Sequence, residues 1–203
     1  LVDRLRQALI PKVATKLQFT SEDVVAAATP DHPSLGLTDQ QQADRVAGLL
    51  RTTGLTYGFA QTVCLMAHGS TSQNNPHEAA HDCGACSGRP GATNARVQSY
   101  ILNHKKIREM LGARGIVIPE TTQFVSSMHD TAADVMAYYD EEVLSAENLN
   151  AHIINIQSFE TALNLNAKER SRRFASIDTK QELEQVRKAI HNRSVSLFEP
   201  RPE

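Results

Sequence analysis

Several features that many proteins share are scarce in this 203-residue chain. It has no tryptophan, its aromatic residues make up 5%, and its only cysteines are Cys64, Cys83 and Cys86. Three cysteines are too few, and odd in number, for the disulfide framework of a small secreted domain. We therefore expect an aliphatic core, a reducing compartment, and thiols that are free for metal binding or redox chemistry.

Strong charge and long apolar runs are missing too. The formal net charge is -2 and no run of lysine and arginine occurs, which argues against a nucleic-acid partner. No apolar stretch approaches the roughly 20 residues that span a bilayer, so a membrane role would come through a partner. Hydrophobic residues make up 40% and charged residues 22%, which suits one globular domain with or without a helical extension.

The two ends of the chain suggest a longer parent. The first residue, Leu1, is not a start methionine, and no recognisable stop follows the last helix. We interpret the chain as an internal piece of a longer protein. A site assembled from distant segments would then be only half present.

The pattern changes twice along the chain. Residues 1–53 are helical in pattern, residues 54–145 mix strands with helices, and residues 146–203 return to a helical pattern. In the middle segment, residues 62–67 form a continuously apolar run and residues 121–128 predict a second strand. A helix or helix pair is expected between them, over residues 94–114, so the fold class is α/β with a parallel sheet flanked by helices.

Each predicted strand ends in a polar cluster, the first beginning at His68 and the second at His129 and Asp130. Ligands of open α/β sheets bind beyond the carboxyl ends of the strands. The first cluster, residues 68–86, holds three histidines, two cysteines and two carboxylates, all of them zinc-binding residue types. The alternative is a polar surface loop with scattered histidines, which rarely also carries two cysteines.

Two short motifs lie inside the first cluster. His77-Glu78-Ala-Ala-His81 matches the H-E-x-x-H string of zinc proteases, but Gly84 leaves under two turns for the helix that this chemistry needs. We interpret that match as a coincidence. Cys83-Gly-Ala-Cys86 could be a redox pair or half of a zinc site, and no second C-x-x-C completes an all-cysteine site.

A different pairing uses His68, which a buried strand would hold in place, together with Cys83. They supply half of a tetrahedral zinc site, with further ligands from His129, Asp130 or the missing part of the parent. His129 and Asp130, with Asp82 and Cys86, are candidates to surround the metal and orient a ligand or water. Two alternatives stay open: Asp130 as the cap of a helix over residues 132–139, and a Cys83/His129/Asp130 nucleophilic triad.

Four motifs in order resemble the DabA family, the β-carbonic-anhydrase-like subunit of an inorganic carbon transporter. They are His68-Gly-Ser-Thr-Ser-Gln-Asn-Asn-Pro-His, Asp82-Cys-Gly-Ala-Cys-Ser-Gly, Asn94-Ala-Arg and Met128-His-Asp-Thr. The resemblance is strongest over residues 54–140. It implies a partial β-carbonic-anhydrase-like sheet in the middle segment, between the helical N- and C-terminal segments.

In that family, zinc is held by the Cys and Asp of a C-x-D element and by a His and a Cys further along. The resemblance assigns the last two roles to His68 and Cys83. No cysteine of this chain is followed by aspartate at the required spacing, so the first two ligands are expected upstream. We expect the isolated piece to be inactive.

The resemblance also implies an activity and a partner. Zinc lowers the pKa of bound water towards roughly 7, the chemistry that hydrates CO2 to bicarbonate. The family couples this reaction to an integral-membrane, ion-translocating subunit (DabB-like), so the expected location is the cytoplasmic face of the inner membrane. The alternatives are a structural zinc or docking module without turnover, and a hydrolase whose zinc depends on His77 and His81.

Overall fold

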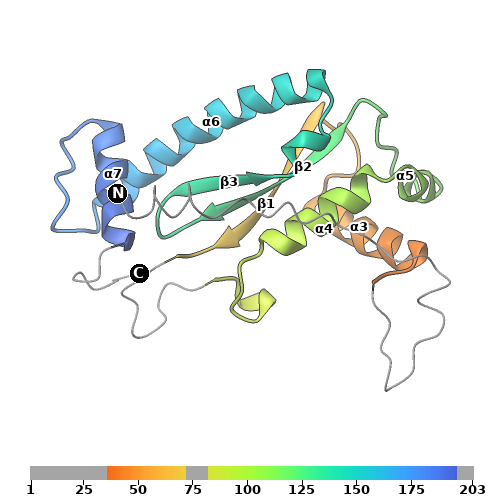
Figure 1. Cartoon of the computed structure of the whole chain (residues 1–203), viewed down its shortest axis with the longest axis horizontal. Helices are drawn as coiled ribbons and strands as arrows, with labels where there is room; N and C mark the ends of the chain where they lie inside the picture. Colours follow the sequence, from red (N-terminus) through yellow and green to blue (C-terminus); the bar gives the residue numbers. More distant parts are fainter. Residues whose placement is uncertain (1–35, 72–81, 196–203) are drawn as a thin grey trace. The chain divides into compact units, whose positions relative to one another are not determined.

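The structure of this chain is a computed structural model that describes residues 36–71 and 82–195. The chain divides into two compact units, Leu1–Gln40 and Gln41–Glu203, and the second holds nearly all of the described residues. Its helices and small sheet confirm the α/β class (Figure 1). The part of the predicted N-terminal helical segment before residue 36 lies outside the described residues.

The sheet has three strands in the order β1-β2-β3. The strands β1 (Thr62–Gly69) and β2 (Gln123–Asp130) are parallel, which confirms both predicted strands and their relation. The third strand, β3 (Val135–Tyr139), runs antiparallel to β2 and makes the sheet mixed.

The alternative of a helix over residues 132–139 is wrong, because β3 occupies most of that segment. A tight turn reverses the chain after β2, and Asp134 takes a left-handed conformation there with φ of 52°. That conformation ends any helix, while the partner strand β2 pairs with the residues that follow.

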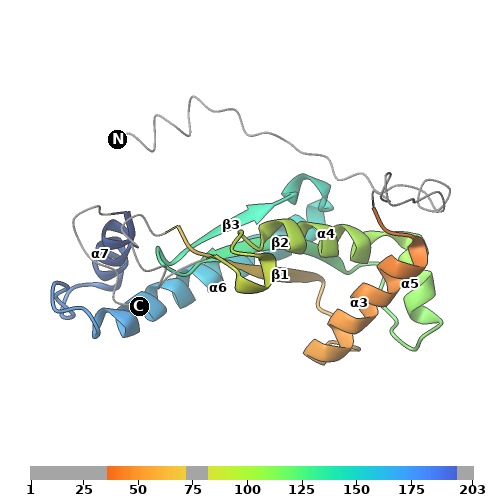
Figure 2. The ribbon, with the colours of Figure 1, turned by 90° about the horizontal axis from the view of Figure 1, so that it is seen from below.

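Helices cover both faces of the sheet. The helix α4 (Ala92–Asn103) packs against β1 and β2 and leads into α5 (Lys105–Gly112), which confirms the predicted helix pair. Before β1 comes α3 (Asp39–Thr53), whose buried positions Ala43, Val46, Ala47 and Leu50 follow the predicted helical period. Figure 2 shows α4 running along the sheet.

The long helix α6 (Ala146–Ser171) lies across the opposite face, as the alternation of β1 side chains shows. Cys64 contacts His152 of α6, whereas Ala67, an odd number of positions away, contacts Gly91 at the start of α4. The Ser145 hydroxyl caps α6 by accepting a hydrogen bond from the Asn148 amide.

Two short 3-10 turns and a last helix complete the described elements. They are η1 (Gly84–Cys86), η2 (Glu141–Val143) and α7 (Leu183–Val195). A buried apolar cluster joins α6 to α7 and the loop between them, through Ala167, Phe174, Ile177, Val186 and Ile190. Within residues 36–71 and 82–195, no helix has the length and apolar character to cross a membrane.

Candidate metal centre

The two polar clusters predicted to share one edge of the sheet do lie side by side. The ladder pairs His68 with His129 and Gly69 with Asp130 at the carboxyl ends of β1 and β2. Paired residues of a ladder point to the same face of the sheet, so the two histidines are neighbours on the α6 face. Both are accessible: His68 is exposed and the His129 side chain is 24% exposed.

The chain returns to this edge after the loop that follows β1. The carboxylate of Asp82 accepts a hydrogen bond of 2.6 Å from the backbone amide of Ser70, two residues beyond His68. Because Asp82 directly precedes Cys83, this bond ties the cysteine segment to the end of β1. The place predicted for Asp82 around a metal stays a prediction.

A second tie joins the same two segments. Cys83 and Arg89 form an isolated antiparallel bridge, and the amide of Gly91 donates a 2.9 Å hydrogen bond to the carbonyl oxygen of His68. A Cβ added at Gly91 would lie 3.0 Å from that oxygen and 3.0 Å from the Ala67 Cβ. Only glycine fits this approach without a shift. The end of β1 and the cysteine hairpin (residues 83–89) are therefore held close together.

The hairpin places its two cysteines together. Cys83 precedes η1 and Cys86 is its last residue, with the Cys86 amide donating to the Cys83 carbonyl at 3.0 Å. A hydrogen bond with the Cys83 thiol raises the pKa of Cys86, and burial and the charge of Cys83 add to the shift. The Cys86 sulfur also accepts a 3.2 Å hydrogen bond from Nδ2 of Asn94.

The Asn94-Ala-Arg motif therefore has two structural roles. Asn94 contacts the cysteine hairpin, and Arg96 forms a bidentate ion pair with Asp140 through bonds of 2.8 and 2.6 Å. The hydrogen bond that Arg96 donates to Asp140 raises the pKa of Arg96. Asp140 also accepts from the Ser126 hydroxyl at 3.3 Å, so the motif anchors α4 to the sheet beside the site.

The Asp130 carboxylate accepts hydrogen bonds from its own turn and from Thr71 rather than from a histidine. Its buried carboxylate accepts 3.1 Å hydrogen bonds from the amides of Ala132 and Ala133, and it accepts from both the amide and the hydroxyl of Thr71. Asp130 therefore caps the β2–β3 turn and fixes the start of the loop after β1. A Cys83/His129/Asp130 triad is not assembled, because His129 and Asp130 point to opposite faces of β2.

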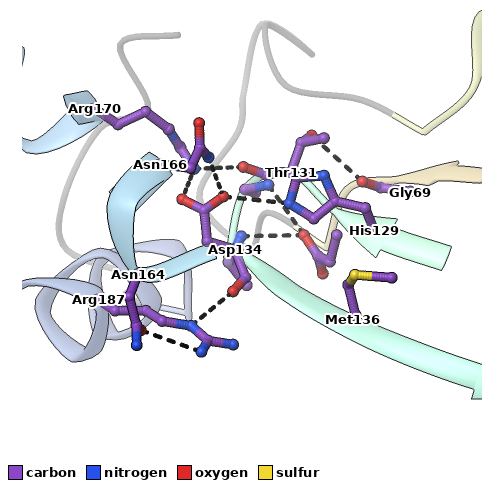
Figure 3. Close-up of polar contacts among 12 residues, drawn as sticks. Gly69, His129, Thr131, Asp134, Met136, Asn164, Asn166, Arg170 and Arg187 are labelled. Atoms are coloured by element: carbon purple, nitrogen blue, oxygen red, sulfur yellow. Dashed lines mark hydrogen bonds and ion pairs between the residues drawn. The ribbon is translucent and has the colours of Figure 1, made fainter. Parts of the chain in front are cut away.

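The carboxylate that does face His129 belongs to Asp134, which the sequence analysis missed. Figure 3 shows this fully buried side chain at the centre of a polar network, with Oδ1 lying 3.3 Å from Nε2 of His129. Asn166 donates to Oδ1 at 2.6 Å and Arg170 donates to Oδ2 at 2.5 Å. Its backbone oxygen accepts from Nε of Arg187 at 3.0 Å.

The donor set fits half of a zinc site. His68 and Cys83 are zinc ligand types, and the bonds at Asp82 and Gly91 hold their segments together. In the part of the chain that the structure describes, no group of three or more His, Cys, Asp or Glu side chains could hold a metal. A complete site would need ligands from elsewhere, and His77, Glu78 and His81 lie outside the described residues.

The third cysteine belongs to a different environment. Cys64 lies under α6, with its sulfur 3.7 Å from Nδ1 of the buried His152. Burial raises the pKa of the Cys64 thiol to about 11, and a hydrogen bond with Asn155 opposes the shift only in part. Cys64 is a neutral core thiol and takes no part in the candidate centre.

The fold and this site define a class, the α/β proteins that carry a ligand site beyond the carboxyl ends of parallel strands. Comparison with known families is more specific, because the family described as "Probable inorganic carbon transporter subunit DabA" matches residues 1–203. The chain belongs to this DabA family, as the four ordered motifs predicted.

Individual relatives agree with the family match. A protein of Nitrosospira multiformis named "Probable inorganic carbon transporter subunit DabA" is 52% identical over 83% of this chain, and that stretch is 19% of the relative. Namesakes from Azotobacter vinelandii and Methylococcus capsulatus are 50% and 43% identical over 85% and 96% of the chain. The chain spans about a fifth of the length of these relatives. No solved structure matches it.

Proposed function

We propose that this chain supplies His68 and Cys83 to the zinc site of an inorganic carbon uptake subunit that hydrates CO2 to bicarbonate. The observation that carries the proposal is the pair of hydrogen bonds from Ser70 to Asp82 and from Gly91 to His68. These bonds hold the two ligand segments at one edge of the sheet. The relatives' shared name, an inorganic carbon transporter subunit, gives the substrate class.

Zinc bound here would supply Lewis-acid activation of water at neutral pH, the chemistry that CO2 hydration requires. The residues of this chain have simpler tasks. His68 and Cys83 would hold two coordination positions, and Asp130 holds Thr71, three residues after His68, by accepting hydrogen bonds from its amide and hydroxyl. His129 stands beside His68 with its ring oriented by Asp134, where it can hydrogen-bond a reactant at the carboxyl ends of the strands.

The remaining metal ligands would come from another part of the parent protein. The resemblance predicts a C-x-D element upstream, and the relatives are about five times as long as the matched stretch, which leaves room for it. In this proposal, a DabB-like, integral-membrane subunit carries the ion flow that drives uptake. The DabA-type subunit then acts at the cytoplasmic face of the inner membrane as a peripheral protein.

The test is inorganic carbon accumulation in cells that depend on the transporter for growth in air. We expect His68→Ala and Cys83→Ser to abolish accumulation, because each removes a metal ligand. The exposed His191 of α7 provides a matched control, and His191→Ala should transport like the wild type. Accumulation that survives both His68→Ala and Cys83→Ser would overturn the proposal.

A further inference from the structure

The strongest unassigned feature is the pair of cysteines on one closed hairpin. Only Cys83 is needed for the proposed zinc site, yet Cys86 sits three residues away and its amide donates to the Cys83 carbonyl. Neither cysteine is in a disulfide, and both are half-buried. The proposed zinc site therefore leaves the Cys86 thiol without a role.

The backbone of the hairpin suits a disulfide between them. The Cys86 amide donates to the Cys83 carbonyl at 3.0 Å, which closes a single 3-10 turn. Cys83 and Cys86 are the first and last residues of this closed turn. Their Cα atoms lie within about 7 Å, and a disulfide needs roughly 4.4–6.8 Å.

Further backbone hydrogen bonds hold the hairpin. The Gly88 amide donates to the Cys83 carbonyl at 3.1 Å, and the Arg89 amide donates to the Cys86 carbonyl at 3.3 Å. Ser87 and Gly88 take left-handed conformations, with φ of 58° and 70°, that reverse the chain. The backbone therefore keeps Cys83 and Cys86 on one closed turn.

We propose that Cys83 and Cys86 form a reversible redox pair, whose disulfide withdraws Cys83 from the metal and switches off carbon uptake. The disulfide itself follows from the hairpin alone, whereas the effect on uptake rests on the proposed function. Bound zinc would slow the oxidation without preventing it, since a coordinated thiolate attacks a disulfide less readily than a free one. The oxidant is a small-molecule disulfide.

The chemistry balances as two successive thiol–disulfide exchanges. The Cys83 thiolate attacks one sulfur of the oxidant, forms a mixed disulfide, and releases the other half as a thiolate. The Cys86 thiol then loses its proton to water and attacks the Cys83 sulfur. The second half of the oxidant leaves as a thiolate, so two electrons have passed from the cysteine pair to the oxidant.

The experiment equilibrates the protein that carries this chain in oxidised and reduced glutathione, with and without a zinc chelator. Free thiols are then alkylated, and a protease that cuts before aspartate releases a peptide beginning at Asp82. Because Asp82 lies between Cys64 and Cys83, this peptide carries the pair without the core cysteine. We expect it to lose two hydrogens on oxidation, to escape alkylation, and to recover fully on reduction.

Three variants sharpen the result. Cys86→Ser should form no internal disulfide and should keep its zinc under the oxidant that strips zinc from the wild type. Cys64→Ala should behave like the wild type, because the half-buried Cys64 contacts His152 of α6 and lies apart from the hairpin. A Cys86→Ala variant repeats the first test in case the serine hydroxyl disturbs Asn94.

The outcomes separate the two proposals. A disulfide between Cys83 and Cys86 in a protein that never binds zinc would support the redox pair and refute the zinc site. If both cysteines stay alkylatable in oxidised glutathione with the chelator present, the redox pair is wrong and the zinc site is untouched. A disulfide that includes Cys64 would also overturn the redox proposal.

Discussion

Two buried aspartates, four residues apart, organise two different regions of this protein. Asp130 accepts hydrogen bonds mainly from backbone amides, in its own turn and at Thr71 beside the candidate metal centre. Asp134 accepts from side chains, those of His129, Asn166 and Arg170. The first carboxylate shapes the loops of the site, whereas the second fastens the helix α6 to the end of β2.

From these different partners we expect Asp134 to contribute more to stability and Asp130 to contribute more to function. A buried carboxylate paired with arginine leaves an uncompensated charge when it is removed, and such losses are large. Removing a carboxylate that accepts hydrogen bonds from backbone amides leaves neutral donors without an acceptor. This costs less free energy of unfolding, but it releases the backbone that the carboxylate held. Four substitutions or conditions test this division, in order of decreasing expected effect on the free energy of unfolding.

The largest effect is expected for Asp134→Ala. It removes a fully buried acceptor from the half-buried Arg170 and the exposed Asn166 and puts alanine at a left-handed position, so unfolding should become easier by about 3 kcal/mol. Urea denaturation measures this. The exposed pair of Asp44 and Arg114 is the matched control, and Asp44→Ala should cost under about 1 kcal/mol. Equal losses in the two variants would contradict the division.

Asp130→Ala should come second, with a loss of about 2 kcal/mol, because buried amides lose their acceptor. Its effect on carbon accumulation should exceed that of Asp134→Ala once both proteins are folded, since Thr71 begins the loop that leaves His68. Asp130→Asn keeps an acceptor oxygen and should retain most of the stability. A folded Asp130→Ala protein with full accumulation would argue against a role at the site.

Gly91→Ala should cost about 1 kcal/mol in the free energy of unfolding and should lower zinc affinity. The added Cβ meets the His68 oxygen and Ala67, so the strand end or the hairpin must shift. Gly112→Ala is the control, because a Cβ there meets nothing within 4 Å. Denaturation and zinc titration of the two variants, compared directly, decide the point; identical zinc affinities would refute the close tie.

The smallest expected effect is on the pH dependence of the free energy of unfolding, through His152 of α6. Burial lowers the pKa of His152 below its ordinary value near 6.5, and Glu141, 3.3 Å from Nε2, opposes the shift. The unfolded chain therefore binds more protons in the window below pH 6.5, and stability falls as pH drops through it. His152→Gln should flatten this dependence between pH 7.5 and 5.5, whereas His191→Gln should not. An unchanged slope in His152→Gln would exclude this group as the cause.

Local pattern predicted the helices and the two parallel strands because each is encoded within its own residues. The apolar run at Val63–Ala67 suits a buried strand, and the period of Val46, Ala47 and Leu50 suits a helix. Residues 132–139 contain good helix formers, and there the local pattern was misleading. Pairing with β2 and the left-handed turn at Asp134 decide that segment, and both depend on contacts beyond it.

The candidate site likewise contains residues that the local sequence could suggest and one, Asp134, that it could not. His68, Asp82 and Cys83 could be named as candidates from the sequence because two recognisable motifs carry them. Asp134 could not, since its partners Asn166, Arg170 and Arg187 follow 32 to 53 residues later. Its one sequence signal is an aspartate just before a strand, at a position suited to a tight turn.

The central claim is that His68 and Cys83 bind the same metal ion. The most direct measurement is zinc per chain in the protein that carries this segment, for the wild type, His68→Ala, Cys83→Ser and His81→Ala. We predict one zinc that disappears in the first two variants and persists in the third. Zinc that is lost only with His81→Ala would contradict the account and favour the H-E-x-x-H hydrolase. No zinc in any form would leave a docking module in its place.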